Sequence, residues 1–386
     1  MRYRYMPKTN KTVELYYWSK FGKAEQFAGG DVRAYHMIPI MMRISTGLPI
    51  LVTPDMYLSI DMISKHKSFS KVMMLLILPI TIIKAQFQHK MPIRYIYCTT
   101  CYSWDILPAL IVKIVTKTRI FCVSHDTPLQ RAGFKFFRES EKYGLVRSYI
   151  FALLEKFQEF LLKFIDGPIA ISDFARHYLP AGNVYDKAIM SSNVISSVLE
   201  LNQLSTERRF DITYLGRIIP RKNLNKLYDA LTLLNPVRTI ELLIITNTDN
   251  DLLRKLRQMF SKINFVNLTV KLNATEDEKY SLLKDSKISI NISYDENFSV
   301  STLESASCGT AVVLSDLPFF KNIYDNCAVF VNQSDPMSII TSIQSLLYDK
   351  ELLFRYQKLA IELANKYITA KVAKADYNEI IKRTML

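Results

Sequence analysis

The chain has 386 residues, of which 49% are hydrophobic and 22% charged, and its formal net charge is +14. This composition excludes a disordered chain, and the length exceeds what one hydrophobic core usually serves, so two domains are expected. Five cysteines, an odd number in a long chain, argue against a disulfide framework. The positive charge favours binding to nucleotides, anionic lipid head groups or nucleic acid.

Short apolar runs with β-branched or aromatic residues alternate with segments of helical spacing along the whole chain. In the first half, the strand-like runs are 13–19, 48–54, 93–98, 120–124 and 167–172. In the second half, they are 211–216, 241–246, 264–270, 287–293 and 311–315. This alternation is typical of parallel sheets covered by helices, so the sequence predicts two successive α/β units.

Three further segments concern membranes and location. The longest apolar run, 72–83, contains Pro79 and is too short to span a bilayer, which indicates a buried helix. The N-terminus lacks the continuous apolar core of a signal peptide, so a cytoplasmic protein is expected. Residues 148–164 predict a helix that is apolar and aromatic on one side and basic on the other. Both a core helix and a helix facing a membrane surface or an acceptor remain open.

The chemistry concentrates after the run 287–293, where the sequence DENFSVSTLESASCGTAVV begins. We expect a turn containing Glu296, a helix from about Ser299, and an end to that helix at Gly309. A helix N-terminus at the carboxyl edge of a parallel sheet binds phosphate through its free N–H groups. Glu304, one turn into the helix, is placed to accept hydrogen bonds from the vicinal hydroxyls of a ribose.

Each of these acids also has a simpler interpretation. Ser301 and Glu304 match the S-x-x-E pattern of a capping box, in which the carboxylate satisfies a backbone N–H. Glu296 lies beside Asp295 in a turn, where acidic side chains are often only solvated.

A second cluster, DITYLGRIIPRKN at 211–223, places Arg217 just after a strand and Lys222 five residues later. The simpler interpretation is a basic turn before a helix. The functional interpretation is a pair of cations near the mouth of the same sheet, since arginine binds phosphate through its planar fork and lysine as a point charge. Such preorganised cations stabilise a leaving diphosphate.

Together the clusters resemble the retaining glycosyltransferases of family 4. The shared pattern is a strand, G-R-x-x-P-x-K-N, and about 75 residues later E-x7-E with C-G-T and another strand. The resemblance implies the GT-B fold: two Rossmann-like α/β domains with parallel sheets facing across a cleft, and a C-terminal helix crossing back to the first domain. The expected domains are 1–192 on the acceptor side, a linker at 193–210, a nucleotide-sugar domain at 211–365 and the returning helix at 366–386.

The resemblance also implies roles for individual residues. Arg217 and Lys222 hold the donor diphosphate, Glu304 holds the ribose, and Glu296 contacts the transferred sugar. The family's E-G-F-G turn is replaced here by Glu296, Asn297, Phe298 and Ser299, so both glycines are lost and a side chain enters the sugar pocket. The identity of the sugar is therefore open. The backbone N–H groups of Asn297, Phe298 and Ser299 are still expected to bind the donor.

In the first half the resemblance is carried by fewer residues. Gly29 and Gly30 follow the first strand where the family has a Gly-rich turn near the donor. His125 ends the fourth strand where the family often has a histidine facing the donor sugar, although a lone histidine at a strand end is usually structural. Ser172, in GPIAISDFARHYL, matches the family's strand, serine and helix.

Two motifs raise the question of a metal. Cys98 and Cys101 form a C-x-x-C without a second pair to complete a zinc site, which favours a strand end with small residues. Asp249 and Asp251 form a D-x-D, the metal-binding signature of the other large glycosyltransferase fold, GT-A. There it lies near the start of the nucleotide-binding half, not in the middle of a second unit. We therefore expect no metal or other cofactor.

The sequence thus predicts a metal-independent retaining glycosyltransferase that moves a sugar from a nucleotide diphosphate sugar to an acceptor hydroxyl. The expected acceptor is a glycan, a lipid or a protein, with a peripheral contact to an anionic membrane and no nucleic acid. The alternative is a basic membrane- or nucleic-acid-binding protein that keeps the GT-B fold without activity.

Overall fold

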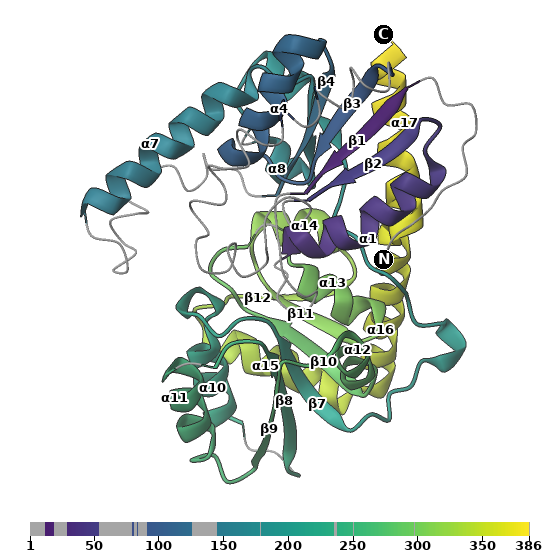
Figure 1. Ribbon diagram of the computed structural model, residues 1–386. Coiled ribbons are helices and arrows are strands. Elements are labelled where there is room, and N and C mark those ends of the chain that lie inside the picture. The colour runs from purple at the N-terminus through teal and green to yellow at the C-terminus, as the bar shows by residue number, and fades with distance from the viewer. Residues whose placement is uncertain are drawn as a thin grey trace. The chain divides into compact units, whose positions relative to one another are not determined.

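The computed structural model describes residues 12–18, 29–53, 79, 80, 83, 91–125, 145–177, 179–234, 238–249, 251–296 and 298–385. The chain forms two units, Met1–Asn193 with Thr369–Leu386, and Val194–Ile368. Within the described ranges each unit contains a parallel sheet of six strands (Figure 1). The predicted class, two α/β units with a C-terminal helix that returns to the first, is confirmed. The run 72–83 lies outside the described residues except for Pro79, Ile80 and Ile83.

The first sheet has the strand order β2-β1-β3-β4-β5-β6. Its strands are β1 (Val13–Tyr17), β2 (Leu48–Val52), β3 (Ile93–Cys98), β4 (Arg119–Ser124), β5 (Gly167–Ala170) and β6 (Ile189–Met190). The helices that the structure bounds in the described part of this unit are α1 (Gly29–Ile44), α4 (Ser103–Thr116), α7 (Leu145–Leu162), α8 (Asp173–His177), α9 (Asn183–Asp186) and α17 (Thr369–Met385).

The second sheet has the order β12-β11-β10-β7-β8-β9. Its strands are β7 (Phe210–Leu215), β8 (Ile240–Thr246), β9 (Val266–Leu272), β10 (Ser286–Asn291), β11 (Ala311–Ser315) and β12 (Ala328–Val331). Its α-helices are α10 (Leu224–Thr232), α11 (Asp251–Phe260), α12 (Glu276–Lys284), α13 (Val300–Ser307), α14 (Pro318–Tyr324), α15 (Pro336–Tyr348) and α16 (Lys350–Ala364). Its described residues also form the short 3-10 helices η3 (Leu201–Gln203), η4 (Pro220–Lys222) and η5 (Asn365–Tyr367).

The inner strands are buried along most of their length because helices cover both faces of each sheet. This explains why β8 and β11 appear in the sequence as nearly continuous apolar runs. The core of the second unit includes Ile212, Leu242, Ile288 and Val313, which lie on the adjacent strands β7, β8, β10 and β11 respectively. The sheet therefore gives the loops at its carboxyl edge a rigid base.

The C-terminal helix α17 is fastened to the first unit by a buried ion pair. Arg33 on α1 contacts Asp376 on α17 at 2.5 Å, and the two side chains are 1% and 2% exposed. The same guanidinium donates to the Tyr97 hydroxyl at 2.7 Å and to the Ser192 carbonyl at 2.8 Å. Burial raises the pKa of Asp376, although the charge of Arg33 opposes this effect. Removing one partner of a buried ion pair strongly destabilises a folded protein, because the other charge stays buried without compensation. These contacts therefore hold α17 in place.

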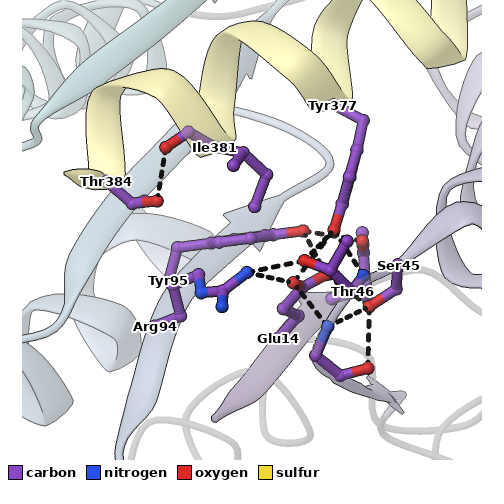
Figure 2. A network of polar contacts seen from close by, with 10 residues as sticks. Glu14, Ser45, Thr46, Arg94, Tyr95, Tyr377, Ile381 and Thr384 are labelled. Atoms are coloured by element: carbon purple, nitrogen blue, oxygen red, sulfur yellow. Dashed lines mark hydrogen bonds and ion pairs between the residues drawn. The ribbon is translucent and has the colours of Figure 1, made fainter. Parts of the chain in front are cut away.

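A second polar network reaches α17 from the amino edge of the first sheet (Figure 2). Its centre is Glu14 on β1, which is fully buried. The carboxylate accepts hydrogen bonds of 2.5–3.1 Å from the Gly47 backbone N–H and from the side chains of Ser45, Arg94, Tyr95 and Tyr377. Ligands of parallel α/β sheets bind at the opposite, carboxyl edge, so this network is structural.

Candidate active site

The second sheet has a topological switch point between β7 and β10. The chain proceeds from β7 to β8 and β9 on one side, then continues with β10, β11 and β12 on the other. Ligands of open α/β sheets bind outside the carboxyl ends of the strands at such a point. The two clusters predicted from the sequence follow these adjacent strands, so the structure brings them to the same place.

The loop after β7 is shaped by its hydrogen bonds and by one glycine. Gly216 has φ +151°, and a Cβ there would lie 3.0 Å from the Tyr214 hydroxyl oxygen. That hydroxyl donates to the carbonyl of Arg217 at 2.7 Å, while the Arg217 side chain is exposed. Pro220 then begins η4, which ends at the buried Lys222. The loop therefore offers one cation to solvent and holds another inside.

Lys222 and Glu296 form an ion pair within this site. Their side chains are 7% and 12% exposed. Burial lowers the pKa of Lys222, Glu296 partly opposes that effect, and the charges of Arg221 and Arg217 lower the pKa further. Glu296 therefore favours the charged form of this buried ammonium, at a position where a diphosphate could replace the carboxylate or share the ammonium with it.

The turn after β10 is fixed by hydroxyl and amide groups. Ser299 has φ +48° and ψ +77°, a left-handed conformation that glycine adopts most easily. Its hydroxyl accepts from the Asn291 side-chain amide at 2.7 Å and caps α13 by accepting from the Thr302 N–H at 3.4 Å. Ser299 thus takes the backbone conformation expected of the glycine that it replaces. The N–H groups of the first turn of α13 point toward the same edge of the sheet.

Glu304 lies in the second turn of α13 and is 7% exposed. Its carboxylate accepts from Lys279 on α12 at 2.7 Å. The capping box considered for Ser301 and Glu304 is not formed, because Ser299 is the N-cap and caps Thr302. The carboxylate is therefore held by a side chain and lies beside the N-terminal half of α13.

Lys279 is a site residue that sequence reasoning missed. A capping box does occur just before it, between Thr275 and Glu278 at the start of α12, and this fixes where α12 begins. Lys279 follows in the first turn and looks in the sequence like an ordinary solvated residue of a charged helix. Only the packing of α12 beside α13 shows that it meets Glu304.

Two of the other predicted donor contacts can be placed only in part. The Phe298 ring is 3% exposed and packs edge-on against Tyr367, with 5.5 Å between the centroids, so it fills the core of the second unit. Any donor contact from Phe298 must come from its backbone. Asn297 lies outside the described residues.

The first-unit candidates lie at the carboxyl edge of their own sheet. Gly29 and Gly30 begin α1, and His125 follows β4. Burial and the charge of Arg33 lower the pKa of His125 to about 3, so the ring is neutral at physiological pH. Its Nε2 lies 3.1 Å from the Thr99 carbonyl and donates to it. Ser172 accepts from the Ala175 N–H at 2.9 Å and thereby caps α8, which is a structural role.

The two metal motifs show no metal geometry. Cys98 and Cys101 are buried free thiols. Asp251 pairs with Arg254 on the exposed face of α11, and Asn250 between the two aspartates is not described. Among the described residues, no three His, Cys, Asp or Glu side chains gather in a metal-binding cluster.

Comparisons with known proteins agree with this location. Residues 201–363 match the model of the family described as glycosyl transferases group 1. This range contains Arg217, Lys222, Glu296 and Glu304. The search of curated protein sequences found no match.

Three solved structures show how far the likeness extends. Anabaena Alr3699/HepE in complex with UDP-glucose has a TM-score of 0.66 and 14% identity, covering 96% of this chain and 99% of that chain. Sucrose-phosphate synthase from Thermosynechococcus elongatus has a TM-score of 0.68 at 14% identity, with coverages of 96% and 99%. A glycosyltransferase from Rickettsia africae has a TM-score of 0.66 at 14% identity, covering 97% of this chain and 99% of that chain. The chain therefore has the GT-B fold over nearly its whole length.

Proposed function

We propose that the protein is a retaining glycosyltransferase that transfers a sugar from a nucleotide diphosphate sugar to an acceptor hydroxyl. The observation that carries the proposal is the joint placement of Lys222, Glu296 and Glu304 at the β7–β10 switch point. All three lie in the range that matches the glycosyl transferases group 1 model.

In the proposed reaction the second unit binds the donor. The diphosphate lies against the exposed Arg217, the ammonium of Lys222 and the N-terminus of α13. Its ribose hydroxyls donate to the carboxylate of Glu304, which Lys279 holds in position. Glu296 contacts the sugar, and the backbone of 297–299 completes the pocket. A complex with UDP-glucose is known for the Anabaena protein, so UDP-glucose is the first donor to test.

The chemical step breaks the bond between the sugar C1 and the diphosphate oxygen, and the bonding electron pair leaves with the diphosphate. Lys222, Arg217 and the helix N-terminus stabilise this developing charge. The acceptor oxygen forms its bond to C1 on the face that the diphosphate leaves, and its proton passes to the leaving phosphate oxygen. The residues described near Lys222 provide the charge stabilisation this step needs without a covalent enzyme intermediate.

Proton NMR of the donor reaction tests the stereochemical outcome. With UDP-glucose and water as a slow acceptor, the proposal predicts that the first glucose formed is the α anomer and that EDTA does not change the rate. Glucose formed first as the β anomer would contradict retention, and loss of activity in EDTA would contradict metal independence.

The alternative function is binding to a membrane or to nucleic acid without sugar transfer. One observation favours a membrane partner: the first unit carries 30 lysines and arginines against 16 aspartates and glutamates, whereas the second carries 20 of each. This charge is compatible with the enzyme as well, and we propose that it serves a peripheral contact with an anionic membrane. Among the described residues, no helix is long and apolar enough to cross a membrane. The expected cytoplasmic location remains a prediction.

A further inference from the structure

Two neighbouring helices of the first unit leave large apolar side chains in solvent. We name this surface the α4–α7 face. It consists of exposed residues on α4, on α7 and just beyond α7: Ile111, Ile114, Val115, Leu153, Leu154, Phe157, Phe160 and Phe164. Their exposure ranges from 38% to 81%, which is unusual for so many adjacent apolar residues on a globular protein.

The exposed residues of α7 form a stripe with helical spacing. Leu153, Phe157 and Phe160 recur at intervals of four and three residues, so they share one side of the helix, and Phe164 follows in the turn just beyond its end. Gln158, Leu161 and Leu162 of the same helix are buried. An ordinary surface helix is polar on its outer side, whereas this exposed stripe of α7 is apolar. The outer side is therefore suited to an apolar environment outside the unit.

Contacts between the helices place both sets of residues on the same part of the unit. Lys113 on α4 donates to the Phe164 carbonyl at 2.9 Å and contacts Asp166 at 2.6 Å. Gln158 on α7 lies 3.5 Å from the sulfur of Cys101, just before α4. Figure 1 shows α7 running out from the sheet beside α4.

Positive charge accompanies the apolar residues. Lys117 and Lys163 are exposed at the ends of α4 and α7, and neither forms an ion pair within the described part of the chain. Lys156 on α7 is 66% exposed and lies 3.2 Å from Glu159. These lysines belong to the unit that carries the whole net charge of +14, since the second unit is neutral.

We propose that the α4–α7 face docks on the surface of an anionic lipid bilayer. The phenylalanine and aliphatic side chains enter the boundary between head groups and acyl chains, and Lys117 and Lys163 reach the lipid phosphates. A second copy of the chain fits less well, because two units of equal positive charge repel each other. Nucleic acid fits less well, because five of the eight side chains are Leu, Ile or Val, which offer no base-stacking surface. Resting on the proposed function, this inference adds that the acceptor hydroxyl is presented at a membrane.

Sedimentation of the full-length protein with lipid vesicles tests the inference. The probes are phosphatidylcholine vesicles with and without phosphatidylglycerol. We expect binding only when phosphatidylglycerol is present. Changing Phe157→Ser and Phe160→Ser together should weaken it at least tenfold, and each of Lys117→Gln and Lys163→Gln about fivefold.

The matched control is Phe354→Ser, which removes a 45% exposed phenylalanine from α16 in the neutral second unit and should leave binding unchanged. Melting curves by circular dichroism confirm that each variant is folded. Equal binding by the double phenylalanine variant and the wild type would overturn the inference. The inference would also be overturned if the wild type did not bind vesicles, or if it bound DNA and not vesicles. A wild-type dimer that becomes monomeric in the double variant would overturn it too.

UDP-glucose affinity, measured on the same variants, separates this inference from the proposed function. The docking inference predicts unchanged affinity for the donor in every face variant. Vesicle binding without donor binding in the wild type would leave the docking face in place and contradict the proposed glycosyltransferase.

Discussion

Ser299 shows how a single side chain can replace a glycine in a strained turn. A non-glycine residue in the left-handed region costs the folded state about 1–3 kcal/mol. Here the Ser299 hydroxyl offsets that strain, because it accepts hydrogen bonds from the Asn291 amide and from the Thr302 N–H at the start of α13. We predict that Ser299→Gly changes the free energy of unfolding by less than about 1 kcal/mol, because relief of strain balances the lost cap.

The same site should not tolerate a β-branched residue. Ser299→Val keeps the strain and removes the hydroxyl's hydrogen bonds with Asn291, Ser301 and Thr302, so the free energy of unfolding should fall by about 2–4 kcal/mol. Urea unfolding of both variants measures the difference. A valine variant as stable as the glycine variant would show that the turn does not require the left-handed conformation.

The buried Lys222 should make donor binding depend on pH. Burial lowers its pKa and Glu296 raises it, so Glu296→Gln should lower the pKa further. Donor binding that needs the charged ammonium is lost as pH rises through this pKa. The alkaline limb of UDP-glucose affinity against pH should therefore move to lower pH in Glu296→Gln.

Asp295→Asn is the control for this experiment. It removes a neighbouring carboxylate that is 49% exposed and that pairs with Arg221 at 3.6 Å, whereas Lys222 pairs with Glu296. Its alkaline limb should match that of the wild type. An unshifted limb in Glu296→Gln would exclude Lys222 as the titrating cation.

At the scale of elements, α12 and α13 act together through Lys279 and Glu304. Without its lysine, Glu304 is left as a buried carboxylate that no longer holds the ribose, so Lys279→Met should weaken UDP-glucose binding about tenfold. It should also abolish the preference of the wild type for the ribose donor over its 2′-deoxy analogue.

Lys271→Met is a matched control for this pair, because Lys271 and Glu278 are also 2.7 Å apart but lie at the surface. This variant should bind both donors as the wild type does. Tighter binding by Lys279→Met would mean that Lys279 competes with the ribose instead of positioning its partner.

Helix α17 depends on one buried contact more than on its surface pairs. Asp376→Ala leaves Arg33 buried without its carboxylate, and the free energy of unfolding of the first unit should fall by about 3–5 kcal/mol. Glu379→Ala removes a partly exposed pair with Arg383 on the same helix, and the loss should stay below about 1 kcal/mol. Guanidinium unfolding compares them, and equal losses would contradict the anchoring role.

For the whole molecule, the sequence predicted what depends on local pattern. Buried strands such as β8 and β11 are nearly continuous apolar runs, and Gly309 at φ +69° ends α13 where expected. The edge strands β6 and β12 were not predicted, and β6 has only two residues, which are too few to carry a pattern. The run at 264–270 begins two residues before β9, because Asn264 and Phe265 form the preceding turn.

The site was predictable to the level of loops but not of contacts. The order of residues places Arg217 and Lys222 after one strand and Glu296 and Glu304 after another, and parallel strands align these ends. Sequence does not show that β7 and β10 are neighbours, that Lys222 is buried against Glu296, or that Lys279 meets Glu304. These pairings depend on how distant elements pack.

Calorimetric titration with UDP-glucose tests the central claim most directly, because it asks whether the β7–β10 switch point binds a nucleotide diphosphate sugar. We predict binding that persists in EDTA, is at least tenfold weaker in Arg217→Ala, and is unchanged in Arg355→Ala, which removes an exposed arginine from α16. Equal affinity in Arg217→Ala and the wild type, or no binding of UDP-, GDP- or ADP-sugars by the folded protein, would contradict the account.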